Sequence, residues 1–104
     1  MPREGVFQTK FREDLEYLYP GCIVCKLDSS YRQGVPDLVM FWNDCWATFE
    51  VKASATARIQ PNQEHFVHKM NDMSFSAFVH PGNVAEVLND LQRAFEDKGA
   101  TFLS

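Results

Sequence analysis

Long apolar runs and the apolar core of a signal peptide are both missing from this chain of 104 residues. A helix that spans a membrane needs about 20 consecutive apolar residues, and no run here approaches that length. The N-terminus likewise lacks the apolar segment that directs secretion. We therefore expect a cytoplasmic protein with no membrane partner.

Cysteine is also scarce, with only Cys22, Cys25 and Cys45, and an odd number cannot pair completely in disulfides. Cys22 and Cys25 have CxxC spacing, but no second pair of metal ligands follows them. They also lie in a strand-like run, where side chains three positions apart point to opposite faces. We expect three reduced cysteines in the core rather than a zinc site or a disulfide.

The chain has no excess of positive charge, since ten Lys and Arg face fourteen Asp and Glu, a net charge of −4. This balance argues against tight nucleic-acid binding, which usually requires a basic surface. The acidic surplus lies mainly in positions 61–104, which carry three basic and six acidic residues. Between Val51 and Asn62 there is no acid, whereas Lys52 and Arg58 are present. That segment could form a modest edge facing phosphates.

Apolar residues make up 45% of the sequence, which indicates a folded domain. The length allows one hydrophobic core, so we expect a single domain over 1–104. The stretch from Val35 to Lys52 contains two runs of branched and aromatic residues around a polar break at Asn43-Asp44. This pattern predicts a β-hairpin. Its first arm, Leu38 to Trp42, is continuously apolar, as in a strand covered on both faces.

In this hairpin a two-residue loop would place Asp37 directly opposite Glu50 on the neighbouring strand. Two carboxylates in that position repel each other. Because strand side chains alternate, Lys52 shares the face of Glu50. A cation between the acids would relieve the repulsion, and Mg²⁺ prefers such oxygen ligands. Alternatively, Asp37 caps a turn and Glu50 and Lys52 form an exposed ion pair of little energetic value. A two-residue shift in register would also separate the acids.

The first helix is predicted over Glu4 to Tyr19, and Pro20-Gly21 ends it. At 100° per residue, Glu4 falls near the middle of the apolar stripe. Glu4 could therefore face the sheet and join the acids of the hairpin, or it could simply favour the positive helix N-terminus. The residues of the stripe are Phe7, Phe11, Leu15 and Leu18.

A strand is predicted over Cys22 to Leu27, followed by a polar loop over 28–34. Within this loop Tyr31 and Arg32 are candidates for contact with a nucleic acid, by stacking and by charge. A solvated connection is the alternative. After the hairpin, Ala53 to Gln60 reads as a polar segment of small residues.

A second helix begins at Pro61 and places Gln63 on its buried face, toward the strand that carries Lys52. His65 and His68 fall on the opposite face and are expected to be solvated. A strand over Ser74 to Val79 follows, which implies a parallel crossover. The buried stripe of the second helix is predicted to be Phe66, Val67, Met70 and Met73.

The last helix is predicted to start at Asn83, with Glu86 as its capping-box partner, and to end at Gly99. It would cover the sheet or contact another subunit. Its apolar stripe is Val84, Val87, Leu88, Leu91 and Phe95.

Several short segments form an ordered set along the chain. They are Gln33-Gly34-Val35, then Pro36-Asp37, then Glu50-Val51-Lys52 thirteen positions after Asp37, and finally Gln63. With Glu4 in the first helix, this set resembles the PD-(D/E)xK nuclease superfamily. It is most similar to the small phage-type VRR-NUC and Holliday-junction-resolvase-like nucleases, over roughly positions 4 to 92. The resemblance implies a restriction-endonuclease-like αβββαβ core with a mixed four-stranded sheet, followed here by a C-terminal helix.

The resemblance also implies a magnesium-dependent endonuclease that hydrolyses DNA, encoded by a phage and active in a bacterial cell. Resolvase-like members act as homodimers on branched or junction DNA. Asp37, Glu50 and the Val51 carbonyl would hold Mg²⁺, or Mn²⁺ in its place, with a contribution from Glu4. Lys52 would hold the attacking water or stabilise developing charge.

Gln63 would hydrogen-bond a phosphate or the attacking water, and Tyr31, Arg32 and Arg58 would contact the nucleic acid. Two other functions remain open. The chain could be a nucleic-acid-binding module without activity on a nuclease fold. It could also be a protein-interaction module, such as an inhibitor, which would suit its acidic surface.

Overall fold

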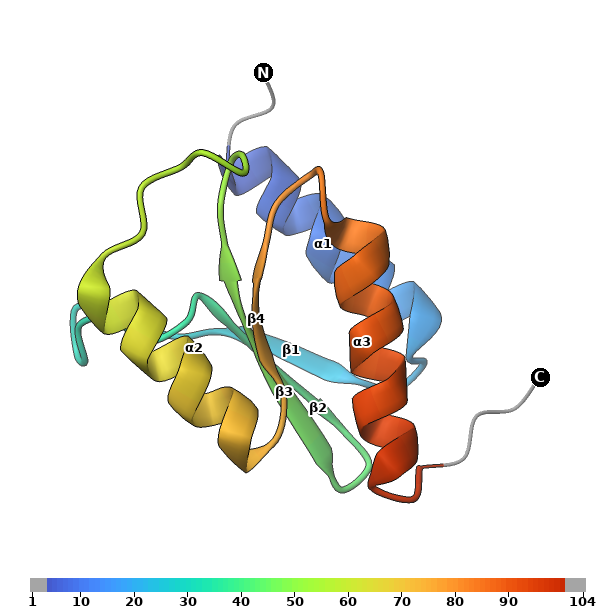
Figure 1. The fold of residues 1–104 in the computed structure, drawn as a ribbon. Coiled ribbons are helices and arrows are strands. Elements are labelled where there is room, and N and C mark those ends of the chain that lie inside the picture. The colour runs from blue at the N-terminus through green and yellow to red at the C-terminus, as the bar shows by residue number, and fades with distance from the viewer. Residues whose placement is uncertain (1–3, 101–104) are drawn as a thin grey trace.

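The computed structural model describes residues 4–100, which form three helices and four strands (Figure 1). The chain runs helix, three strands, helix, strand, helix. This order confirms the expected α/β class, an αβββαβ core with a C-terminal helix. The elements are α1 (Glu4–Leu18), β1 (Ile23–Lys26), β2 (Leu38–Trp42), β3 (Cys45–Val51), α2 (Pro61–Met73), β4 (Ser76–Val79) and α3 (Val84–Asp97).

The four strands form one mixed sheet in the order β1-β2-β3-β4. The β1–β2 and β2–β3 pairs are antiparallel, and the β3–β4 pair is parallel as the crossover required. Trp42 faces Cys45 across a two-residue turn, which confirms the predicted hairpin register. Asn43 has a φ of 56°, so an asparagine adopts the left-handed conformation that this turn needs.

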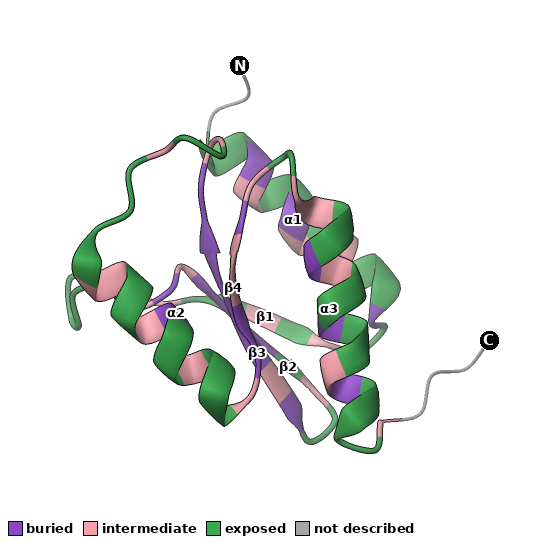
Figure 2. Ribbon diagram, in the orientation of Figure 1, coloured by how far each residue is buried: buried purple, intermediate pink, exposed green. Residues whose placement is uncertain are grey.

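Helices cover both faces of the sheet, α1 and α3 on one side and α2 on the other (Figure 1). Alternation along β3 distributes its residues between these two layers. Ala47, Phe49 and Val51 are fully buried in the main core against α1 and α3. Thr48 and Glu50 point toward α2, and both are buried as well. The strand is therefore covered on both faces, as its purple ribbon shows in Figure 2.

Aromatic rings join α1 and α3 to the sheet. Phe11 of α1 meets Phe49 of β3 edge-on, with ring centroids 5.0 Å apart. Phe95 of α3 stacks on Trp42 of β2 at 6.1 Å. These contacts fix the two helices against one face, which leaves the other face of the sheet for α2.

Several burial predictions fail at the ends of elements. Leu18 and Met73 are exposed, because each is the last residue of its helix and is covered on fewer sides, whereas Tyr19 is buried in place of Leu18. Phe41 is 47% exposed, so only the first part of β2 is covered on both faces. Cys25 is exposed on the edge strand, contrary to the expected core position.

The other thiols lie inside, Cys45 buried and Cys22 partly buried, and all three cysteines are free.

The predicted capping box at α3 is wrong. Asn83 does precede the helix, but its side chain makes no cap hydrogen bond. Instead its Oδ1 accepts from the His80 N–H at 2.8 Å and its Nδ2 donates to the Phe78 carbonyl at 3.0 Å. Asn83 thus organises the preceding turn. Within residues 4–100, no helix has the length and apolar character needed to cross a bilayer.

Candidate active site

Asp37, Glu50 and Lys52 meet at one end of the sheet, on the face that α2 covers. Asp37 directly precedes β2, Glu50 lies in β3, and Lys52 directly follows β3. The β2–β3 register pairs Leu38 with Phe49, so Asp37 lies across from Glu50 as predicted. Glu50 is only 3% exposed and Lys52 only 9%. Two buried ionisable groups and the partly buried Asp37 thus share one end of the sheet.

Backbone hydrogen bonds hold Asp37 in place. Its Oδ2 accepts the Val51 N–H at 2.8 Å, and its carbonyl accepts the Leu27 N–H at 2.8 Å. A carboxylate that accepts a backbone N–H is oriented without needing a flexible partner. Asp37 therefore belongs to the sheet framework, which contradicts the alternative of a simple turn cap.

Glu50 is the most perturbed acid in the site. Burial raises the pKa of Glu50 to about 8, and its hydrogen bond to Asp37 and the charge of Asp37 add to the effect. Lys52 lowers this pKa, while the negative charge of Glu4 raises it. Burial beside Asp37 therefore favours the protonated form of Glu50. Such a pair is also a place where a cation can replace the proton.

The Lys52 ammonium is surrounded by acceptors. Its Nζ donates to Gln63 Oε1 at 2.9 Å and to the Arg58 carbonyl at 3.0 Å, and Glu50 Oε2 lies 3.8 Å away. An ammonium has three donors and no acceptor, so these oxygens match its charged form. Both members of the Lys52–Glu50 pair are buried, which contradicts the alternative of an exposed surface ion pair. Lys52 therefore presents a fixed positive charge beside the acid pair.

Gln63, on the first turn of α2, connects this amine to the acids. Its Oε1 accepts from Lys52 and from the Gln60 N–H at 2.9 Å, and its Nε2 lies 3.5 Å from Glu50 Oε2. Both ends of the amide are engaged within the protein. Gln63 is thus a positioning residue in this structure, and its expected contact with a phosphate or water stays a prediction.

Comparison of the chain with protein-family models, with curated proteins and with solved structures gives no match. The chemistry of the site therefore rests on its own residues.

Glu4 is the first residue of α1 and is exposed. The negative charge of Glu4 contributes to raising the pKa of Glu50, and no hydrogen bond joins these two residues. Among the residues 4–100, no three acidic, histidine or cysteine side chains are grouped closely enough to hold an ion together. The structure thus gathers two acids, and the expected share of Glu4 in an ion site stays a prediction.

The residues expected to contact nucleic acid lie in two loops, one before β2 and one after β3. Tyr31 is 89% exposed in the loop between β1 and β2. Arg32, in the same loop, places its guanidinium 5.8 Å from the centre of the Phe66 ring of α2. Arg58 lies in the loop between β3 and α2, where its carbonyl accepts from Lys52 while its side chain remains exposed. These three side chains are exposed, and their contact with nucleic acid stays a prediction.

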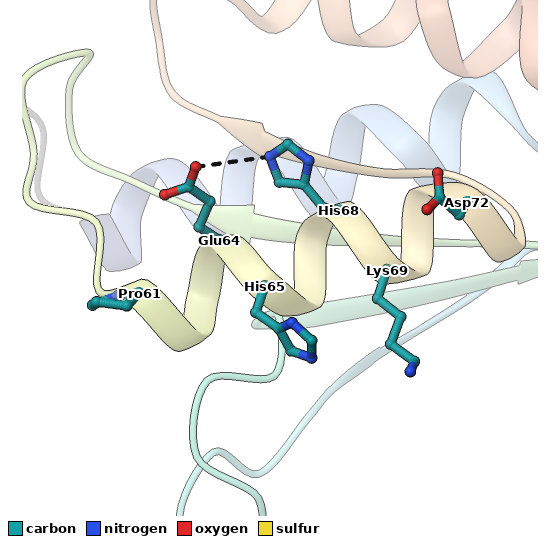
Figure 3. Close-up of a pocket in the computed structure, with 6 residues that line it drawn as sticks. All are labelled: Pro61, Glu64, His65, His68, Lys69 and Asp72. Carbon is teal, nitrogen blue, oxygen red and sulfur yellow. Dashed lines mark ion pairs between the residues drawn. The ribbon is translucent and has the colours of Figure 1, made fainter.

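A hollow on the outer surface of α2 does not belong to this site. It is lined by Pro61, Glu64, His65, His68, Lys69 and Asp72 (Figure 3). Both histidines are exposed, as expected, and His68 Nε2 lies 3.9 Å from Glu64 Oε1. In Figure 3 the His65 and His68 rings point to different sides of the helix, so they do not converge on one point.

Sequence reasoning missed the part played by backbone groups. The Arg58 carbonyl and the Gln60 N–H complete the hydrogen bonds of Lys52 and Gln63. Every residue carries these groups, so residue identity gives no signal for them. Only the path of the loop between β3 and α2 brings them to the site.

Proposed function

We propose that this chain is a magnesium-dependent nuclease that hydrolyses DNA phosphodiester bonds. The observation that carries the proposal is the convergence of Asp37, Glu50, Lys52 and Gln63 in one partly buried network at the end of the sheet. Such a set of ionisable groups in a partly buried site, with one strongly perturbed pKa, is typical of catalytic centres. The ordered motif that these residues form in the sequence supports the same reading.

The donor set suits a divalent cation. Asp37 and Glu50 offer carboxylate oxygens, and burial together with the hydrogen bond and charge of Asp37 raises the pKa of Glu50, so an ion between them would displace the proton of Glu50. Mg²⁺ is commonly held by one or two carboxylates and several waters, which fits a site with two acids. Asp37, Glu50 and the Val51 carbonyl would hold it, with Glu4 nearby. When bound, Mg²⁺ lowers the pKa of a water and neutralises phosphate charge.

The chain's own residues would complete the reaction centre. Lys52 presents its ammonium from a fixed position, where it stabilises negative charge that develops on the phosphate. Gln63 and the Arg58 carbonyl hold that ammonium so that little reorganisation is needed. Tyr31, Arg32 and Arg58 would hold the flanking nucleic acid. More specifically, we propose that the chain acts as a homodimer on branched or junction DNA.

A protein-interaction role, for example as an inhibitor, is the second candidate. Ile23 of β1 pairs with Phe41 of β2, and both of these large apolar side chains are exposed. Exposed apolar patches often mark protein contacts.

Cleavage assays with Mg²⁺ on linear, nicked, flap and four-way DNA test the nuclease. Asp37→Asn and Lys52→Met each remove one charged group at nearly constant size. We expect each to reduce the cleavage rate by about 100-fold or more, because preorganised charge supplies several kcal/mol of transition-state stabilisation. Circular dichroism checks that both variants fold.

Glu64→Gln and Lys69→Met are the matched controls, since both remove an exposed charge from the outer surface of α2. They should cut DNA at the wild-type rate. Equal rates for the site variants and the wild type would contradict the assignment of this site. A wild type that cuts none of the DNA substrates with Mg²⁺ would contradict the nuclease and leave the protein-interaction role.

A further inference from the structure

His80 stands at the same end of the sheet as the candidate active site. It follows β4 directly, and the parallel β3–β4 register pairs Glu50 with Phe78 and Val51 with Val79. The Lys52 N–H donates to the Val79 carbonyl at 2.8 Å, so the chain at His80 runs beside Lys52. Because alternate residues share a face, His80 follows Ser76 and Phe78 to the side of the sheet that carries the acid pair.

The turn after β4 is organised around this histidine. The Gly82 N–H donates to His80 Nδ1 at 3.0 Å, and the His80 N–H donates to Asn83 Oδ1 at 2.8 Å. The Asn83 N–H in turn donates to the His80 carbonyl at 3.1 Å. A Cβ on Gly82 would lie 3.0 Å from His80 Cε1, so a glycine lets the imidazole pack against the turn. Both the backbone and the ring of His80 are thereby held.

The hydrogen bond from Gly82 also fixes the tautomer of the ring. A neutral imidazole whose Nδ1 accepts a hydrogen bond carries its proton on Nε2. Nε2 is therefore a donor, and His80 is only partly buried. An oriented N–H at the rim of a site that already holds Lys52 suits an anionic oxygen.

We propose that His80 Nε2–H binds a phosphate oxygen of the nucleic-acid backbone next to the bond that is cut. This inference rests on the proposed nuclease function and adds a substrate contact from a third segment, the turn between β4 and α3. His80 contributes to substrate binding and to its position, and Lys52 and the acid pair remain the reacting centre.

Two substitutions separate a substrate contact from a structural role. His80→Asn keeps an acceptor for the Gly82 N–H, because the Asn side-chain oxygen stands in for Nδ1, and it removes the donor at Nε2. His80→Gln places a side-chain amide donor near the position of Nε2. We expect His80→Asn to unfold at the wild-type temperature and to bind DNA about fivefold more weakly, the value of one hydrogen bond. His80→Gln should recover most of the affinity.

Binding is measured by fluorescence anisotropy with a labelled DNA duplex in EDTA, so that no metal and no cleavage contribute. A parallel series with Mg²⁺ measures KM and kcat, and we expect His80→Asn to raise KM with little change in kcat. Equal affinity of the wild type and His80→Asn would overturn the assignment of His80 alone. A wild type that binds DNA but never cuts it would overturn the nuclease function, and the affinity of His80→Asn would then decide only whether His80 contacts a DNA phosphate. A wild type that binds no DNA would overturn both proposals.

Discussion

At the scale of single residues, the raised pKa of Glu50 makes stability depend on pH. The ordinary pKa of a glutamic acid is 4.5, and burial beside Asp37 raises the pKa of Glu50 to about 8 in the folded protein. Between these two values the folded chain holds more protons than the unfolded chain. Stability must therefore fall as the pH rises through this window.

Glu50→Gln removes this dependence, because the amide is neutral at every pH. Without metal, the free energy of unfolding of the wild type should fall relative to the variant by at most about 1.4 kcal/mol per pH unit between pH 5 and 8. Urea titrations at several pH values measure the difference. Titration of the histidines is common to both proteins and cancels.

Glu64→Gln is the control for this comparison, since Glu64 is an exposed acid on α2. It should follow the wild-type profile at every pH. A Glu50→Gln profile parallel to that of the wild type would mean that Glu50 titrates normally, and the raised pKa of Glu50 would then be wrong.

The pairing of these residues was accessible from the sequence, whereas their hydrogen bonds were not. A two-residue turn and the alternation of strand side chains fix Asp37 opposite Glu50 and place Lys52 on the same face. The periodicity of the second helix likewise directs Gln63 to the site. The Arg58 carbonyl depends on the path of an irregular loop, which no pattern of side chains encodes.

At the scale of elements, the loop before β2 is seated on α2 through a close contact at Gly34. Its φ is +92°, and a Cβ there would lie 2.7 Å from Asn62 Cγ. Asn62 neighbours Gln63, so this contact joins the loop carrying Arg32 to the turn of α2 that holds Lys52. Glycine is thus required at position 34 both by conformation and by space.

Gly34→Ala should therefore destabilise the protein by about 2 kcal/mol or more, since the strain of a positive φ is joined by a steric overlap. Gly21→Ala is the matched control. Gly21 has a similar φ of +87°, but nothing lies within 4 Å of the added Cβ. Gly21→Ala should lower the stability by only about 1 kcal/mol, because it carries the cost of a positive φ without a steric overlap. Thermal unfolding of the three proteins measures both effects, and equal losses would contradict the contact with Asn62.

The order of the elements and the buried faces of the helices could be predicted from periodicity, but burial at the ends of the helices could not. Phe7, Phe11 and Leu15 are buried as the stripe of α1 requires. At Leu18 the same stripe fails, because the helix ends there and Tyr19 takes the buried position instead. Periodicity assumes that the neighbouring layer is as long as the helix, and at Leu18 and Met73 it is not.

At the scale of the whole molecule, the site is assembled by all three layers. Asp37, Glu50 and Lys52 come from the sheet, Gln63 from α2, and the charge of Glu4 from α1 on the other face. Figure 1 shows the start of α1 at the end of the molecule where the loops after β3 and β4 emerge. An ion bound between the acids would therefore stabilise the complete fold, because the unfolded chain does not hold these groups together.

Mg²⁺ should stabilise the folded protein and so raise its unfolding temperature. At a concentration ten times the dissociation constant, the free energy of unfolding should increase by about 1.4 kcal/mol, and it should grow with the logarithm of the concentration above that. The sign of the pH effect follows from Glu50. Below pH 8 the ion must displace the proton of Glu50, so the apparent affinity should rise with pH and level off above the pKa of about 8. Differential scanning fluorimetry with Mg²⁺ at pH 6, 7, 8 and 9 measures this trend.

Asp37→Asn should abolish the stabilisation by Mg²⁺, whereas Glu64→Gln should leave it intact because that acid lies on the outer surface of α2. Loss of the effect in both variants would indicate binding to surface charge rather than to the acid pair. A stabilisation that decreases as the pH rises from 6 to 8 would be equally decisive, since an ion that competes with a proton for Asp37 and Glu50 has to bind better when the proton leaves.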